Sequence, residues 1–102
     1  MKNSDVETWT IFARDVIVTN ESLTFKLSDG RTISAPLAWY PRLMNGTRKE
    51  RNNWELGCGI GVHWPDLDED ISVENLLQGK PSGESKKSFQ RWLNQRKMKA
   101  AG

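Results

Sequence analysis

The chain has 102 residues, of which 36% are hydrophobic and 27% charged, and five are tryptophans, a composition that predicts one packed domain and excludes a disordered chain. The first eight residues lack the apolar run of a signal peptide, no stretch is long enough to span a membrane, and the single cysteine excludes an internal disulfide. We therefore expect a cytoplasmic protein without a membrane segment.

The charge is unevenly distributed along the chain. Residues 1–78 carry 8 Lys or Arg against 12 Asp or Glu, a net charge of −4, whereas residues 79–102 carry 7 against 1, a net charge of +6. We expect a single α+β domain over residues 1–79, followed by a basic linker and a helix or tail over residues 80–102.

Alternating apolar residues predict the first β-hairpin. Two strands, over residues 14–19 and 22–28, joined by a tight turn would place Val16 opposite Phe25, so that their apolar faces coincide.

The next turn is predicted from its register. A two-residue loop at Asp29-Gly30 would turn the apolar faces of the two strands to opposite sides. A three-residue loop over residues 28–30 instead places Phe25 opposite Ile33, with Gly30 in the left-handed conformation.

Prolines and a capping motif then predict short helices. Pro36 ends the third strand, and one helical turn is expected on either side of Pro41. Thr47 and Glu50 have the spacing of a capping box, which predicts a helix over residues 48–54.

Residues 56–64 are predicted to form one strand that Pro65 ends. The three glycines in this segment do not form a dinucleotide-binding loop, because more strand follows where a helix would be needed. We interpret them as the glycine-lined face of a strand or bulge against which Trp39 or Trp54 packs closely.

The most clearly marked helix begins after Ser72, its predicted N-cap. Ile71 and Leu76 have the spacing of a hydrophobic staple, and Gly79 would end the helix. Residues 68–70 are acidic and are interpreted as favourable charge before this helix, with a magnesium ion or a basic partner as the alternative. A calcium loop is excluded, because glycine and glutamate are missing where it requires them.

His63 is the single histidine, and as a catalytic residue it would pair with Cys58 or Asp66. Residues five apart on one strand point to opposite faces, so a half-buried structural histidine is the favoured interpretation. We predict no catalytic residue, no metal site and no cofactor.

The C-terminal segment repeats apolar residues at helical spacing among basic ones, which predicts a short basic amphipathic helix or a frayed tail. It is interpreted as a docking helix or a solvated end, with nucleic-acid binding as the functional alternative. The residues assigned to nucleic-acid binding are Lys86, Lys87, Arg91, Trp92, Arg96 and Lys97.

Over about residues 12–79 the chain resembles the bacterial and phage family catalogued as domain of unknown function 2442. The resemblance is carried by Phe25-x-Leu27-x-Asp29-Gly30-Arg31, by Pro36-Leu37, and by Val62-His63-Trp64-Pro65 through Asp70-Ile71-Ser72-Val73-Glu74-Asn75-Leu76-Leu77. It implies a small α+β domain with an antiparallel sheet, found alone, beside toxin–antitoxin-like genes, or fused to a C-terminal helix-turn-helix. No catalytic residues are established for the family, and the residues after Gly83 are too few for three packed helices.

We expect an α+β fold with a small antiparallel sheet of about four strands, short helices packed on it, and a basic C-terminal helix or tail. The expected function is a non-enzymatic regulatory or protein-interaction module, antitoxin-like in one form, whose protein partner is encoded nearby. Nucleic-acid binding through the C-terminal segment is the alternative. The residues assigned to partner binding are Trp39, Tyr40, Asp66, Asp68 and Glu69.

Overall fold

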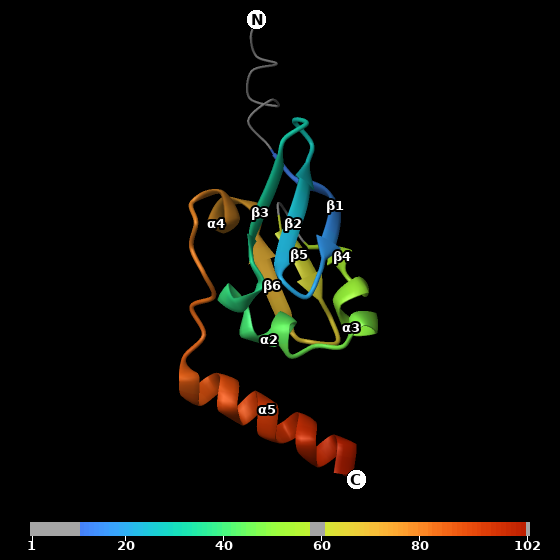
Figure 1. The fold of residues 1–102 in the computed structure, drawn as a ribbon, viewed down its shortest axis with the longest axis vertical. Helices are drawn as coiled ribbons and strands as arrows, with labels where there is room; N and C mark the ends of the chain where they lie inside the picture. The colour runs from blue at the N-terminus through green and yellow to red at the C-terminus, as the bar shows by residue number, and fades with distance from the viewer. Residues whose placement is uncertain (1–10, 58–60, 102) are drawn as a thin grey trace, which may run out of the picture.

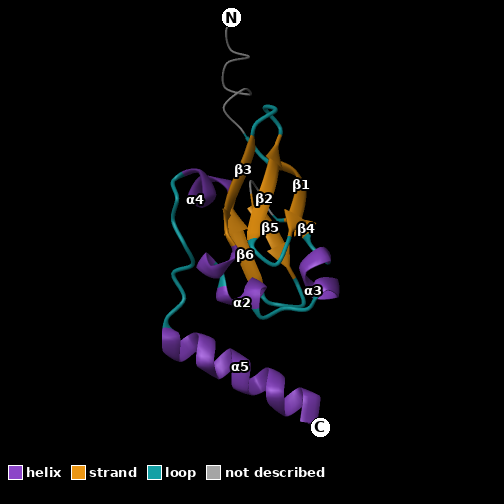
Figure 2. Ribbon diagram, in the orientation of Figure 1, coloured by secondary structure: helices purple, strands orange, loops and turns teal. Residues whose placement is uncertain are grey.

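Two small antiparallel sheets and several short helices form the body of the protein, and a longer C-terminal helix lies across one end of it (Figure 1). The computed structural model describes residues 11–57 and 61–101. The strands gather in the centre, one sheet in front of the other, with the helices at their margins (Figure 2). This arrangement confirms the α+β class.

The first sheet consists of two consecutive hairpins. Its antiparallel strands pair in chain order: β1 (Ala13–Val18), β2 (Ser22–Leu27) and β3 (Thr32–Pro36). Val16 lies opposite Phe25, and Phe25 opposite Ile33, so both predicted registers are confirmed. The consequence is a β2 strand whose apolar side chains share one buried face.

The turn between β2 and β3 is the predicted three-residue loop. Gly30 has a φ of 95°, and its N–H donates to the Leu27 carbonyl at 3.1 Å. The Leu27 N–H in turn donates to the Arg31 carbonyl at 2.8 Å and closes the loop. A Cβ at Gly30 would meet nothing within 4 Å, so the backbone conformation alone favours glycine here.

Three short helical segments connect the two sheets. They are the 3₁₀ turn η1 (Leu37–Trp39), α2 (Pro41–Met44) and α3 (Arg48–Asn52). The turns on either side of Pro41 and the Thr47–Glu50 capping box are confirmed. Helix α3 ends two residues earlier than predicted, because Asn53 leaves the helical conformation and the chain enters a strand.

The second sheet corrects the predicted single strand over residues 56–64. Its antiparallel strands are β4 (Glu55–Leu56), β5 (Gly61–Trp64) and β6 (Glu69–Ser72). Strands β4 and β5 are antiparallel, so the chain reverses between them, and the Gly57 N–H donates to the Gly61 carbonyl at 2.9 Å. Cys58, Gly59 and Ile60 lie outside the described residues.

Gly57 and Gly61, the two of these glycines that the structure describes, lie against strand backbone rather than against a tryptophan. A Cβ added at Gly57 would approach the Gly61 backbone at 3.5 Å, and one added at Gly61 would approach the Ile71 carbonyl oxygen at 3.3 Å. The close approach at Gly57 and Gly61 is therefore between neighbouring strands, and the expected packing of Trp39 or Trp54 is wrong at these two glycines, while Gly59 lies outside the described residues.

Two of the acidic residues before Ser72, Glu69 and Asp70, belong to a strand that the sequence pattern did not reveal. Glu69 lies opposite Trp64 and Asp70 opposite His63, which makes β6 the edge of the second sheet. The described strands therefore form two sheets of three rather than one sheet of about four. Cross-strand pairing outweighs the weak strand propensity of acidic residues here.

Helix α4 (Val73–Leu77) follows with both predicted ends. The Ser72 hydroxyl accepts the Asn75 N–H at 3.0 Å. Gly79 has a φ of 72°, and the Lys80 N–H returns to the Asn75 carbonyl at 2.9 Å, as in a Schellman motif.

A single hydrophobic core lies between the two sheets and receives side chains from both. Trp64 of β5 is fully buried in it, and its indole N–H donates to the Arg51 carbonyl at 2.9 Å, so its one polar atom is satisfied. In the described part of the chain, no helix has the length and apolar character needed to cross a membrane.

Candidate nucleic-acid interface

The C-terminal segment is a helix rather than a frayed tail. Helix α5 (Lys86–Ala101) begins after Ser85, whose hydroxyl accepts the Ser88 N–H at 3.1 Å as an N-cap does. Most of its residues are strong helix formers, and it contains neither proline nor glycine. The structure thus presents the basic C-terminal charges on one regular helix.

One side of α5 is attached to the body through Trp92. This residue is 9% exposed, and its ring is stacked on that of Phe89 with 5.8 Å between centroids. The guanidinium carbons of Arg42 and Arg96 lie 5.2 Å and 4.7 Å from the indole centroid, both within cation–π distance. Trp92 is the anchor of the helix on the body.

An ion pair reinforces this attachment. The two terminal nitrogens of Arg96 donate to the two carboxylate oxygens of Glu50, at 2.8 and 3.1 Å. The hydrogen bonds from Arg96 lower the pKa of Glu50 and raise that of Arg96. Glu50 is held in place because it is also the third residue of α3, in its capping box. The capping motif therefore positions the partner of α5.

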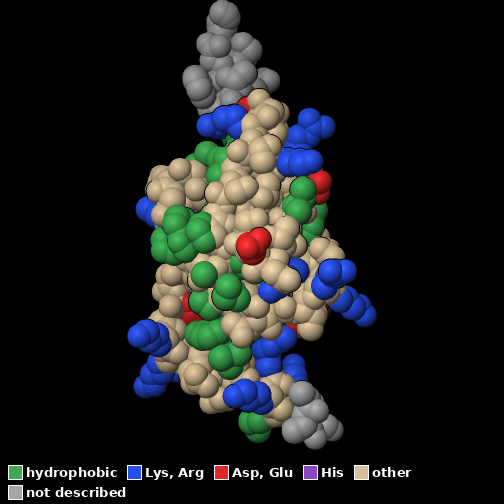
Figure 3. All heavy atoms as spheres, viewed as in Figure 1, with side chains coloured by type: hydrophobic (Ala, Val, Ile, Leu, Met, Phe, Trp, Pro, Cys, Tyr) green, Lys and Arg blue, Asp and Glu red, His purple; other side chains and the backbone are tan. Residues whose placement is uncertain are grey.

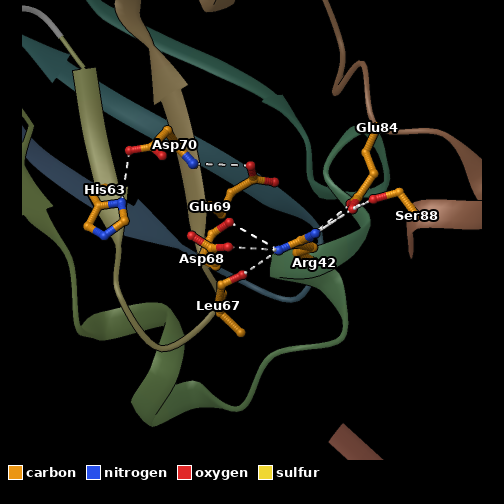
Figure 4. A network of polar contacts seen from close by, with 8 residues as sticks. All are labelled: Arg42, His63, Leu67, Asp68, Glu69, Asp70, Glu84 and Ser88. Atoms are coloured by element: carbon orange, nitrogen blue, oxygen red, sulfur yellow. Dashed lines mark hydrogen bonds and ion pairs between the residues drawn. The ribbon is translucent and has the colours of Figure 1, made fainter. Parts of the chain in front are cut away.

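Arg42 holds the linker that leads into α5 (Figure 4). It donates to Glu84 and to the carbonyls of Leu67 and Asp68, the latter two at 3.2 and 3.1 Å. The Ser88 hydroxyl of α5 donates to Glu84 at 2.7 Å. The hydrogen bonds from Arg42 lower the pKa of Glu84. The start of α5 is thereby fixed to the turn before β6.

Part of the acidic surface faces α5. Asp66 and Asp68 are exposed, and they line a pocket of about 390 Å³ together with Arg96 and Lys99 of the helix. These two acids therefore share a pocket with cations of α5. The ion pair that joins the body to the basic helix is Arg96–Glu50.

The opposite side of α5 carries cations that have no ion-pair partner among the described residues. Successive helical residues turn by about 100°, which directs these side chains away from Trp92. Within the described residues none of them forms an ion pair, and Lys and Arg side chains stand out along the α5 end of the molecule (Figure 3). These exposed cations are Lys86, Lys87, Arg91 and Lys97.

Two of these cations are placed where folding does not favour them. Lys86 and Lys87 occupy the first turn of α5, which contains no acidic residue. The helix dipole disfavours positive charge at this end by some tenths of a kcal/mol per residue. Interaction with the helix dipole therefore does not account for the position of these two lysines.

The residues predicted to bind nucleic acid divide into two groups. Trp92 is buried and Arg96 is paired with Glu50, so neither is available to a ligand in the way the sequence suggested. The reason is that removing the large apolar surface of Trp92 from water by packing it against the body is more favourable than leaving the ring exposed to a ligand. The four exposed cations remain as the candidate interface.

The residues predicted to bind a protein partner are only partly exposed. Tyr40 is 2% exposed and its hydroxyl donates to the Lys80 carbonyl at 3.3 Å, so it is buried and not accessible to a partner as its assignment requires. Trp39 is half-buried against the core. Asp66 accepts a hydrogen bond from Asn53, and the side chain of Asp68 is 86% exposed.

Glu69 is also less accessible than expected. Its Oε1 accepts the Asp70 N–H at 3.1 Å, whereas its buried Oε2 has no hydrogen-bond partner among the described residues. Burial raises the pKa of Glu69. As a residue of β6 beside the core, it cannot serve as a fully exposed contact.

His63 pairs with a residue that the sequence did not single out. Its Nδ1 lies 2.8 Å from a carboxylate oxygen of Asp70, directly opposite on the neighbouring strand. Asp66 is hydrogen-bonded elsewhere, and Cys58 lies outside the described residues. Within the described ranges, no three His, Cys, Asp or Glu side chains are grouped to hold a metal ion.

Three residues that hold α5 in position were not predicted from the sequence. They are Arg42, Glu84, and Glu50 in its role as ion-pair partner of Arg96. Their contacts join positions 42 or more residues apart, and no local pattern reports such a distance. The opposite charges of the body and the C-terminal segment were the one available signal that the two would associate.

The family described as "Protein of unknown function (DUF2442)" matches residues 13–82. The chain belongs to this family. The DUF2442 match spans both sheets and α4 and ends in the linker, so α5 lies outside the matched residues. Among curated proteins, none matches the sequence.

Two solved structures resemble the DUF2442 chain. An uncharacterized protein from Chromobacterium violaceum, solved by NMR, has a TM-score of 0.61 and 23% identity over 71% of this chain and 69% of its own. A crystal structure of a protein of unknown function from Rhodospirillum rubrum has a TM-score of 0.60 and 25% identity over 72% of this chain and 93% of its own. Both support the fold and leave the function open.

Proposed function

We propose that this protein is a non-enzymatic nucleic-acid-binding module that contacts phosphates through the outward face of α5. The observation that carries the proposal is the contrast between the two sides of the helix. On the inner side, Arg96 is paired with Glu50 and Lys99 faces body acids. On the outer side, four cations stand exposed without an acidic partner among the described residues.

The chemistry of that face favours a polyanion. Lysine and arginine bind phosphates by charge, and release of the counterions condensed on a nucleic acid supplies most of the binding free energy. A lipid surface is less suitable, because membrane-binding helices present a broad apolar face. The apolar residues Phe89, Trp92 and Leu93 are instead packed against the body.

The test is binding of fluorescein-labelled DNA, followed by fluorescence anisotropy over a series of salt concentrations. With three or four phosphate contacts, log K should fall with log salt with a slope of about −3 to −4. A variant with the four outward cations changed to glutamine should lose most of this slope. The substitutions are Lys86→Gln, Lys87→Gln, Arg91→Gln and Lys97→Gln.

A matched control removes the same charge from the body. Its four positions are exposed cations outside α5, namely Arg14→Gln, Lys26→Gln, Arg48→Gln and Lys80→Gln. This variant should retain most of the affinity and of the salt slope. Equal loss in both variants would show that only net charge matters, and absence of binding at low salt would remove the proposal.

A protein partner is the second candidate, and an antitoxin-like role is one form of it. It is supported by the edge strands β1 and β4, which carry the exposed apolar side chains of Ile17 and Leu56. Such edges offer unpaired backbone groups to a partner strand. Size-exclusion chromatography with the product of a neighbouring gene tests it, and Ile17→Lys should weaken any complex that uses this edge.

A further inference from the structure

We infer that α5 binds duplex DNA in the major groove and contacts base edges through Gln90, Arg91 and Asn94. This inference rests on the proposed function and names its ligand class. Gln90 and Asn94 lie on the face turned away from Trp92, Arg91 lies at the edge of that face, and all three are exposed. Gln90 and Asn94 are one turn apart, and their amides are hydrogen-bonded at 3.1 Å, which aligns them along the helix.

The composition of this face suits base recognition as well as phosphate contact. Asparagine and glutamine form paired hydrogen bonds with adenine, and arginine does so with guanine, all in the major groove. In α5 Gln90 and Asn94 lie in the middle of the outward face and Arg91 lies at its edge, with lysines before and after them along the helix, at Lys86 and Lys97. Lysines alone would bind phosphate; the central amides add groups that distinguish bases.

The aromatic residues of α5 argue against a single-stranded ligand. Binding of single strands relies on exposed rings that stack on bases. Trp92 is buried between two guanidinium groups, and Phe89 is stacked on Trp92 and packed against the core. Duplex RNA is also disfavoured, because its major groove is too deep and narrow for side chains to read.

The dimensions of the helix match the groove of B-form DNA. An α-helix with its side chains is about 10–12 Å wide, close to the roughly 12 Å width of the major groove. At about 1.5 Å per residue, Lys86 and Lys97 lie about 16 Å apart along the axis, so they reach phosphates beyond the central base contacts. No other element lies on the far side of α5 in Figure 1.

The attachment of α5 keeps this face oriented. Arg42 holds the linker through Glu84, and the Trp92 and Arg96 contacts hold the middle of the helix. A helix fixed in this way loses little conformational freedom on binding, which favours recognition of a defined site.

The experiment compares ligands and sequences with the full chain. Anisotropy is measured with a 20-base-pair DNA duplex, one of its strands, and an RNA duplex of the same length, and preferred sequences are selected from a random duplex pool. We expect duplex DNA to bind at least about tenfold more tightly than the single strand and the selection to enrich a short motif.

Substitution of both amides then separates base reading from phosphate contact. Gln90→Ala with Asn94→Ala should weaken binding to the enriched motif about 10- to 100-fold, as loss of one or two base contacts does, and leave binding to unrelated duplex within twofold. The control Gln78→Ala, at the C-cap of α4, should change neither.

Equal affinity for duplex and single strand, or a pool without an enriched motif, would overturn this inference and leave the proposed function intact. Absence of binding to all three ligands at low salt would remove both. A loss of affinity for unrelated duplex equal to the loss for the motif would also overturn the base-reading role.

Discussion

Gly30 determines the turn of the second hairpin, because it alone among the loop residues has a positive φ. We predict that Gly30→Ala destabilises the protein by roughly 1 kcal/mol, since a Cβ disfavours this conformation while the surrounding space is open. Urea unfolding measures the difference.

The matched control for this prediction is Gly83→Ala. Gly83 also has open space around a Cβ but lacks a positive φ, so the substitution should leave the stability within about 0.5 kcal/mol. Equal destabilisation at both positions would refute the conformational explanation.

Glu69 is a residue whose charge opposes folding. Burial raises its pKa above the ordinary value of 4.5, so protonation of Glu69 is more favourable in the native state than in the unfolded chain. The contribution of Glu69 is therefore most favourable below pH 4.5 and is lost as the pH rises through the raised pKa. We predict that Glu69→Gln increases stability at pH 7 and makes little difference at pH 4.

Denaturant unfolding at both pH values tests this, with Glu55→Gln on β4 as an exposed control that should have no effect. Glutamine can still accept the Asp70 N–H, so the local hydrogen bond survives. A loss of stability at pH 7 would mean that attraction between Glu69 and Arg42 outweighs the cost of burial.

At the scale of single elements, α5 depends on one aromatic side chain for its position. We predict that Trp92→Ala releases the helix from the body, because it removes two cation–π contacts worth about 1 kcal/mol each as well as the buried ring. Hydrogen exchange should become much faster in residues 79–101 and stay slow in both sheets.

The control for this prediction is Arg91→Ala on the outer face of the same helix. Arg91 is exposed, and its loss should leave exchange in the linker unchanged. Unchanged protection in the Trp92→Ala variant would show that the Arg96–Glu50 pair and the Arg42–Glu84 contact hold α5 without the ring.

At the scale of the whole molecule, we propose that residues 13–79 fold without α5. Trp92 is the only α5 residue in the buried core of the described chain. A chain ending at Ser85 retains the Arg42–Glu84 contact and both sheets. It should unfold cooperatively, with a midpoint lowered by about 4–8 °C for each kcal/mol that α5 contributes.

Calorimetry of the shortened chain provides the measurement, and DNA binding by the same chain provides the link to function. Cooperative unfolding together with loss of binding would support a stable body that carries a separate binding helix. A shortened chain without a cooperative transition would contradict this division.

Local sequence patterns determined much of the fold. The hairpin registers, the left-handed Gly30, the capping box at Thr47 and the ends of α4 depend on residues a few positions apart. Backbone conformation and side-chain alternation act over that same short range, which is why they could be read from the chain. The same is true of the basic character of the C-terminal helix.

Only the tertiary structure decided what those elements do together. The reversal between β4 and β5, the strand β6 and the division into two sheets depend on pairing between strands. The side of α5 that remains free depends on Trp92 and on contacts that Arg42 and Glu50 make across more than 40 residues. Because burial and ion pairing are properties of the packed chain, sequence patterns could predict a basic helix but not which of its cations would stay exposed.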